Sequence, residues 1–329
     1  MTSRVRVGIA GTGAYLPERA VPNSFFEGIL DTSDEWIVQR TGIRERRWAS
    51  EDQACSDLCI EAAKRALESA EMDAADLDLI VLGTLTPDHL LPSTACLVQD
   101  AIGAKNAGAF DVNAACTGFL TALHTGEAFV AAGRAKRVLA IGGEVLSKFV
   151  DLQDRGSCIL FGDGAGATIL TPHDDVGRGE ILETTLGADG DGFKYIHMVA
   201  GGSRKPATHE TIESREHYIR VHGREVFRFA VSRMGSLIED YVNRYGADEI
   251  GLIVPHQVNR RIIDAALDRI GMTDEKVVVN IHAYANTSAA TVPIAFDEAL
   301  RGGRIEKGKL VVLVAFGAGL TWGSTLIRW

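Results

Sequence analysis

At 329 residues, with 46% hydrophobic and 24% charged residues, the chain can bury a large core and contains no low-complexity tract. Its net charge of −10 argues against non-specific nucleic-acid binding, and it has neither an apolar run of roughly 18 residues nor a signal-peptide pattern. Five cysteines without a CxxC pair indicate neither a disulfide framework nor a zinc ribbon. We therefore expect a cytoplasmic globular protein with no metal, no membrane partner and no nucleic-acid partner.

The first hundred residues alternate predicted strands and helices. A strand over residues 5–10 ends in Gly11-Thr12-Gly13, which lacks the third glycine of a dinucleotide fingerprint. A capped helix is predicted to begin near Ser33 or Asp34, and an amphipathic helix to span residues 56–70. A buried strand follows at residues 77–83, a loop at 86–92 and a helix at 93–102.

Cys116 lies at a predicted strand-to-helix junction. Phe110 and Val112 belong to a buried strand, and an apolar helical pattern runs from Thr117 to about Ala132. A thiol at this place faces the partial positive end of a helix, which favours the thiolate, and serine hydrolases hold their nucleophile on a similar turn. Cys116 is therefore a candidate nucleophile, and a buried cysteine that only fills space is the alternative.

The second half of the chain repeats this order of elements. Helices are predicted over residues 224–245, 259–270 and 286–300, and strands over 250–255, 277–280 and 310–315. The segment ADLDLIVLG at 75–83 resembles ADEIGLIVP at 247–255, which indicates a duplicated α/β domain. Such alternation predicts mixed, mostly parallel sheets covered by helices. We place the boundary near residue 178, which gives halves at 1–178 and 179–329.

The repeat predicts that three reactive side chains meet. Cys116 precedes the strand beginning at 137 by 21 residues, and Asn286 precedes the strand beginning at 309 by 23, so they occupy matching turns. His256 follows the strand at 250–255 directly. Open sheets bind ligands beyond the carboxyl ends of their parallel strands. If the halves pack about a pseudo-two-fold axis, all three residues lie at one site.

With these residues identified, the sequence resembles β-ketoacyl-acyl-carrier-protein synthase III, the initiating condensing enzyme of type II fatty-acid synthesis in the thiolase-fold superfamily. The resemblance covers almost the whole chain and implies a layered αβαβα arrangement of the two halves. It rests on seven segments in family order: DTSDEWIVQRTGIRERR (31–47), NAACTGF (113–119), DRGSCILFGDGAGA (154–167), GREVFRFAV (223–231), PHQVNRRII (255–263), ANTSAATVP (285–293) and FGAGLTWG (316–323).

The resemblance implies a Cys116–His256–Asn286 triad and a ping-pong reaction. Cys116 takes the acyl group of an acyl-CoA primer, and malonyl-acyl-carrier-protein then loses CO₂ and attacks the acyl-cysteine. A ring N–H of His256 and the amide of Asn286 would donate to the thioester oxygen of the enolate. Backbone N–H groups of Cys116 and Ala318 would bind the acyl oxyanion. No cofactor is implied, because the CoA thioester is a substrate.

The resemblance also implies binding residues around a CoA tunnel. Arg228 and Arg261 would attract the acidic carrier protein. Phe316 and Leu91 would shape the acyl pocket, Leu91 from a loop that relatives extend across a homodimer. The CoA-binding positions are Thr32, Trp36, Arg40, Arg155, Gly223, Phe227 and Asn259.

Five positions depart from a family pattern: Leu91, Val221 and His222 bear on the choice of primer, and two alanines bear on the backbone path. Ala285 and Ala318 stand where some relatives have glycine. We expect the backbone path to survive if φ is negative at both positions, because alanine is strained at positive φ.

Several other enzyme classes fit the sequence less well. A thiolase would need a second cysteine within 316–323, elongating condensing enzymes use two histidines, and plant-type polyketide synthases lack the 31–47 block. A nicotinamide oxidoreductase would need the glycine fingerprint. Two alternatives stay open: a related condensing enzyme of specialised metabolism that uses an unusual acyl-CoA, and a non-catalytic homologue that binds a carrier protein.

Overall fold

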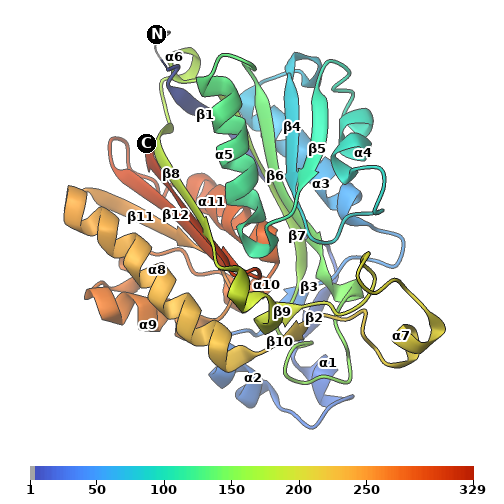
Figure 1. Cartoon of the computed structure of the whole chain (residues 1–329). Coiled ribbons are helices and arrows are strands. Elements are labelled where there is room, and N and C mark those ends of the chain that lie inside the picture. The colour runs from blue at the N-terminus through green and yellow to red at the C-terminus, as the bar shows by residue number, and fades with distance from the viewer. Residues whose placement is uncertain (1–3) are drawn as a thin grey trace.

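The computed structural model describes residues 4–329, in which two mixed sheets alternate with three layers of helices (Figure 1). The first sheet has the order β1 (Val7–Tyr15), β7 (Asp163–Pro172), β6 (Val138–Val145), β4 (Leu79–Gly83), β5 (Gly108–Val112). The second has the order β11 (Ile250–Pro255), β12 (Leu310–Gly317), β13 (Thr321–Arg328), β8 (Glu180–Ala188). The predicted layered α/β fold is confirmed.

The central layer consists of α5 (Gly118–Ala131) and α11 (Thr291–Arg301), which contact both sheets. Both helices bury most of their residues, because a sheet covers them on each side. The outer layers are α3 (Cys55–Ala70) with α4 (Thr94–Ala101) on the first sheet, and α8 (Gly223–Tyr245) with α9 (Arg260–Ile270) on the second. Each outer helix buries only the face that packs on its sheet.

The expectation of mostly parallel sheets is wrong in detail. The parallel pairs are β4–β6, β4–β5 and β11–β12, whereas β1–β7, β6–β7, β12–β13 and β8–β13 are antiparallel. Strands buried on both faces carry continuous apolar runs in either direction, so the sequence pattern does not distinguish them. Residues 277–280 form no strand; Val277 makes only an isolated bridge to Ile253. The boundary near residue 178 remains a prediction and falls between β7 and β8.

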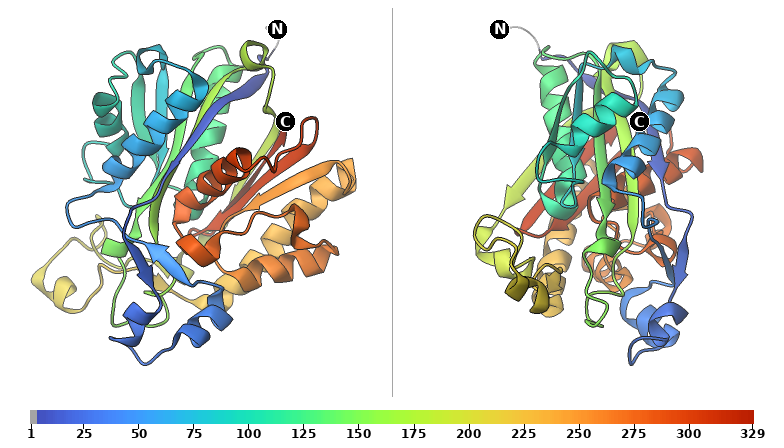
Figure 2. Two further views of the ribbon diagram at one scale, coloured as in Figure 1. Left: turned by 180° about the vertical axis from the view of Figure 1, so that it is seen from behind. Right: turned by 90° about the vertical axis from the view of Figure 1, so that its right-hand side faces the viewer.

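The remaining elements are short, and several lie together at one end of the molecule in Figure 1 and in the left view of Figure 2. This end holds β2 (Ala20–Pro22), α1 (Ser24–Glu27), α2 (Asp34–Thr41), β3 (Glu45–Arg47), β9 (Ile196–His197), α7 (His209–Glu213) and β10 (Arg220–Val221). The others are η1 (Ala74–Asp76), η2 (Ala115–Thr117), η3 (Leu146–Lys148), α6 (His173–Val176), η4 (Gly190–Tyr195), η5 (Asp274–Lys276), α10 (Ile281–Tyr284) and η6 (Ser288–Ala290).

Arg46 anchors this end to the rest of the fold. It is fully buried and donates hydrogen bonds to the carbonyls of Val21 and Ile159 and to Oδ1 of Asn23, at 2.9–3.0 Å. Burial lowers the pKa of the guanidinium to about 10, so it stays charged near neutral pH.

Within residues 4–329, no helix is long and apolar enough to cross a membrane.

Candidate active site

Cys116, His256 and Asn286 line one cavity of about 190 Å³. The first lies between β5 and α5, the second follows β11, and the third precedes η6. The other lining side chains are mainly apolar and come from both halves, among them Leu85, Leu160, Ile219, Val226 and Phe229. The predicted meeting of the three residues therefore holds in the fold. Their chemical roles remain predictions at this point.

Close backbone packing holds the turn that carries Cys116. A Cβ on Gly317 would lie 2.8 Å from the Cys116 nitrogen, and a Cβ on Gly83 would lie 2.3 Å from the carbonyl carbon of Gly118. Ala115, just before the cysteine, has φ of +48°. Glycine at these two contacts lets β12 and β4 approach the turn, so Cys116 sits on a rigid support.

The thiol of Cys116 is protonated in the free site. Its exposed surface faces the cavity, and burial raises its pKa to about 12 despite a lowering interaction with the Ser288 side chain. This shift is opposite in direction to the expectation that the position favours the thiolate. Removing an anion from water into an apolar cavity favours the neutral thiol.

His256 is held by both its backbone and its ring. Its N–H donates to the carbonyl of Val314 at 2.7 Å, and the ring nitrogen Nδ1 lies 2.6 Å from Oγ1 of Thr291. The ring meets Phe316 edge-on, with 5.4 Å between centroids. Nε2 has no hydrogen-bonding partner within residues 4–329. Burial lowers the pKa of His256 to about 3, so the ring is neutral at physiological pH.

Asn286 is positioned by a strained segment. Its N–H donates to the carbonyl of Leu160 at 2.9 Å, and its Oδ1 accepts the N–H of Ser288 at 2.8 Å. This leaves the amide nitrogen as the group that can donate to a ligand. Ala285 has φ of +58°, so the condition of a negative φ is not met there, whereas Ala318 does not have a positive φ. The fixed carbonyl of Leu160 and the following turn impose this conformation on the alanine.

The predicted CoA residues gather beside α2. The guanidinium of Arg155 lies 4.8 Å and that of Arg40 5.7 Å from the ring centre of Trp36. Ser33, one of the two predicted caps, accepts the N–H of Trp36 at 3.2 Å. Asn259 is the N-cap of α9 and donates to the Arg40 carbonyl at 3.0 Å. These contacts form one basic and aromatic surface.

The other predicted binding residues lie on α8, on α9 and just before α2. Gly223 is the first residue of α8, and the hydroxyl of Thr32 is buried without a partner in the described chain. Phe227, one turn into α8, has the exposed guanidinium of Arg261 5.9 Å from its ring centre. Arg228 points to solvent, with 69% of its side chain exposed.

The two predicted acyl-pocket residues differ in place. Phe316 lines the cavity, as expected. Leu91 is 87% exposed and does not line it within one chain. Its predicted role concerns a second copy of the protein and therefore stays a prediction.

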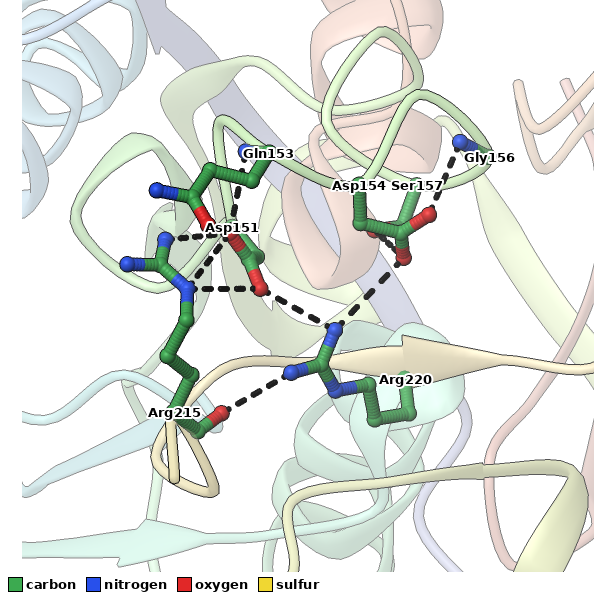
Figure 3. A network of polar contacts seen from close by, with 7 residues as sticks. All are labelled: Asp151, Gln153, Asp154, Gly156, Ser157, Arg215 and Arg220. Atoms are coloured by element: carbon green, nitrogen blue, oxygen red, sulfur yellow. Dashed lines mark hydrogen bonds and ion pairs between the residues drawn. The ribbon is translucent and has the colours of Figure 1, made fainter. Parts of the chain in front are cut away.

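An ion-pair network near Arg155 was not foreseen from the sequence (Figure 3). Asp151 binds Arg215, at 3.0 Å from its Nε, and Arg220, at 3.1 Å. Arg220 also lies 3.8 Å from Asp154. The network connects the segment around α7 to the loop that carries Arg155. The hydrogen bond from Arg215 lowers the pKa of Asp151, which keeps it charged.

Three polar residues near the triad also escaped the sequence analysis: Thr291, Ser288 and Glu144. Glu144 had a visible signal, since an acidic residue at the end of an apolar strand must be paired or protonated when buried. Ser288 and Thr291 gave no such signal in the sequence, because serine and threonine are common near helix starts.

Comparison with known proteins identifies the family of this chain. Family models described as 3-Oxoacyl-[acyl-carrier-protein (ACP)] synthase III and its C terminal match residues 110–190 and 242–329. A curated protein of Caldanaerobacter subterraneus subsp. tengcongensis named beta-ketoacyl-[acyl-carrier-protein] synthase III is 51% identical and covers 100% of this chain and 99% of its own. The chain belongs to the β-ketoacyl-acyl-carrier-protein synthase III family.

Solved structures extend the similarity to the fold. The 3-oxoacyl-[acyl-carrier-protein] synthase III of Aquifex aeolicus VF5 is 44% identical, has a TM-score of 0.89, and covers 98% of this chain and 100% of its own. The priming β-ketosynthase of the R1128 polyketide pathway is 34% identical, also with a TM-score of 0.89, and covers 100% of this chain and 98% of its own. The protein is thus a thiolase-fold condensing enzyme, an acyltransferase that initiates fatty-acid synthesis.

Proposed function

We propose that Cys116 is acylated by an acyl-CoA primer and that His256 and Asn286 then promote its decarboxylative condensation with malonyl-acyl-carrier-protein. The observation that carries this proposal is the convergence of the three residues, from three separate elements, on one mainly apolar cavity. A space-filling cysteine would not need both an unpartnered ring nitrogen and a free amide group beside it.

In the first half-reaction the Cys116 sulfur attacks the thioester carbonyl, and the sulfur of CoA leaves. The developing oxyanion would be held by the backbone N–H groups of Cys116 and Ala318. The close approach of Gly317 to the Cys116 nitrogen supports this role, because it brings the turn that carries Ala318 against the nucleophile. Losing one oxyanion donor typically costs about 3 kcal/mol in transition-state stabilisation.

In the second half-reaction the malonyl group loses CO₂, and the electron pair of the broken bond forms an enolate. Nε2 of His256 and the amide nitrogen of Asn286 would donate to the enolate oxygen. This role requires the neutral tautomer in which Nδ1 accepts the hydroxyl proton of Thr291 and Nε2 carries the ring proton, and burial keeps His256 neutral. The α-carbon then attacks the acyl-cysteine, and the thiolate of Cys116 leaves.

Substrate binding would divide between two surfaces. Trp36 with Arg155 would hold the adenine of CoA, and Arg40 would meet its phosphates. The exposed Arg228 and Arg261 would attract an acidic carrier protein despite the overall negative charge. We further propose a cytoplasmic homodimer in which Leu91 reaches the partner's acyl pocket. Its exposure in one chain supports this role.

The alternative among condensing enzymes is an enzyme of specialised metabolism that loads an unusual acyl-CoA. The similarity to the R1128 priming β-ketosynthase supports this alternative. A non-catalytic homologue is less well supported, because the nucleophile and both donors are present.

The test is intact mass after incubation with acetyl-, isobutyryl- or octanoyl-CoA, for the wild type and for Cys116→Ala. One acyl adduct on the wild type alone, followed by release of a 3-oxoacyl product upon addition of malonyl-acyl-carrier-protein, is expected. The best-loaded CoA identifies the primer class. No adduct with any of the three would refute a simple acyl primer and favour the specialised alternative or a silent homologue.

A further inference from the structure

The loop that carries Arg155 consists of turns over residues 155–160, with no helix or strand to fix its path. The guanidinium of Arg155 lies 4.8 Å from the ring centre of Trp36 and donates to the carbonyl of Asp31 at 2.5 Å. Its side chain is nevertheless 46% exposed, and both contacts are made by the end of a long side chain. Other contacts must therefore hold the backbone of this loop in place.

Two carboxylates hold the loop on either side of Arg155. Asp151 has a side chain that is only 4% exposed, and its carbonyl accepts the N–H of Asp154 at 2.8 Å. The side chain of Asp154 in turn accepts the N–H of Gly156 at 3.0 Å and the hydroxyl of Ser157 at 2.6 Å. Because Arg155 lies inside this set of hydrogen bonds, its backbone position depends on the two aspartates.

Two arginines from a distant part of the chain bind these aspartates (Figure 3). Arg215 donates from Nε to both carboxylate oxygens of Asp151, at 3.0 and 3.1 Å. Arg220 lies 3.1 Å from Asp151 and 3.8 Å from Asp154, and it donates to the carbonyl of Arg215 at 3.0 Å. A planar guanidinium fixes the orientation of such partners better than an ammonium group does. The four residues thus form one closed ion-pair network.

Arg220 connects this network to a wall of the active-site cavity. It lies in β10, which pairs with β9 and places Val221 opposite Ile196. Both of these residues line the cavity, as does Ile219, which is 5% exposed and donates its N–H to the carbonyl of Phe149 at 2.9 Å. Arg220 therefore extends from a packed segment and can support the loop.

The second arginine does more than balance charge. Arg215 alone pairs with both oxygens of Asp151, so neutralising this buried carboxylate does not require another cation. Arg220 reaches further, to Asp154, which directly precedes Arg155 in the chain. This contact is the one that a role in positioning Arg155 requires.

We propose that Arg220, together with Arg215, is a positioning residue for CoA binding, because the ion-pair network holds the loop so that the guanidinium of Arg155 stays over the ring of Trp36. This inference rests on the proposed role of Arg155 and Trp36 in holding the adenine of CoA. Arg215 and Arg220 touch no substrate and act through Arg155. The network therefore matters for acyl donors that contain the adenosine part of CoA and not for donors that end at pantetheine.

The test compares two acyl donors, acetyl-CoA and acetyl-pantetheine, in the acylation of Cys116 measured by rapid quench and intact mass. Arg220→Gln and Arg215→Gln should raise the KM for acetyl-CoA by about 2- to 30-fold, the range expected for loss of the Arg155 cation–π contact itself. The maximal rate should change by less than about twofold, and both constants for acetyl-pantetheine should match wild type. Arg220→Lys should retain part of the affinity, since it keeps the charge but loses the planar group.

A double variant and a control separate positioning from a general loss of structure. Arg155→Ala combined with Arg220→Gln should have the same KM for acetyl-CoA as Arg155→Ala alone, because the second arginine acts only through the first. Arg244→Gln is the matched control and should resemble wild type. Arg244 also bridges two carboxylates, Glu183 and Asp240, at 2.9 and 2.8 Å, and its side chain is 41% exposed.

Three results overturn the proposal: an unchanged KM of Arg220→Gln for acetyl-CoA, an equal loss with both donors, or additive losses in the double variant. An equal loss with both donors would mean that the network only maintains the fold around the cavity. If Arg220→Gln does not fold, Arg220→Lys decides by the same comparison of donors.

Binding of CoA itself, measured by isothermal titration calorimetry, provides a readout that needs no acylation. The Kd of Arg220→Gln for CoA should be about 2- to 30-fold higher than that of wild type. A wild type that binds CoA but accepts no acetyl group refutes the proposed function, whereas the comparison of Kd values still tests the positioning role. Equal Kd values in wild type and Arg220→Gln, or a wild type that binds no CoA, overturn the positioning role.

Discussion

Thr291 should control the condensation step without affecting acylation. Its hydroxyl, 2.6 Å from Nδ1 of His256, is the contact that orients the ring, together with the edge of Phe316. Thr291→Val keeps the shape of the side chain but leaves a buried ring nitrogen unpaired, which costs about 1–3 kcal/mol. Complete loss of the hydrogen bond that the His256 ring donates would remove about 3 kcal/mol of transition-state stabilisation. We therefore expect the kcat of condensation to fall between about 5-fold and about 100-fold.

The assay compares two steps on the same variant. Product release with malonyl-acyl-carrier-protein should slow, whereas loading of Cys116 from acyl-CoA and the KM for malonyl-acyl-carrier-protein should change by less than about threefold, because only the ring's orientation is disturbed. Thr291→Ser should restore condensation, since it returns the hydroxyl. A folded Thr291→Val protein with wild-type condensation, or with equal losses in both steps, would refute this reasoning.

Four further outcomes are expected. Arg46→Met should lower the free energy of unfolding by about 3 kcal/mol or more in chemical denaturation, because three buried acceptors lose their donor. Arg155→Ala should raise the KM for acyl-CoA by about 2- to 30-fold, through loss of a cation–π contact, with little change for malonyl-acyl-carrier-protein; an equal rise for both would contradict it. Burial lowers the pKa of His256 from 6.5 to about 3, so the folded protein disfavours protonation of this ring. The contribution of His256 to the free energy of unfolding should be fully present above pH 6.5 and should fall by up to about 5 kcal/mol as the pH approaches 3. His256→Gln should flatten this decrease in pH-dependent unfolding. Gly142→Ala should cost about 1–3 kcal/mol of stability, since its Cβ would meet the Ala289 carbonyl oxygen at 2.4 Å, and an unchanged Tm would show that η6 can move.

Much of the site could be inferred from the sequence because it depends on order along the chain. The matching turns at Cys116 and Asn286, and the strand end at His256, follow from a repeat of elements that hydrophobic patterns reveal. The directions of β7, β8 and β13 could not be inferred, since strands buried on both faces look alike whichever way they run.

The amino-acid sequence by itself determined the alternation of strands and helices, the duplication, and the family, because these depend on local periodicity and on residues close together in the chain. Only the tertiary structure decided the ionisation of the site. Burial, which is a property of the folded surroundings, keeps the Cys116 thiol protonated and His256 neutral and brings Glu144 to a pKa of about 7. Thr291, which contacts the His256 ring, and Ser288, which lines the same cavity as Cys116, are far from those residues in sequence, so no local pattern could reveal them.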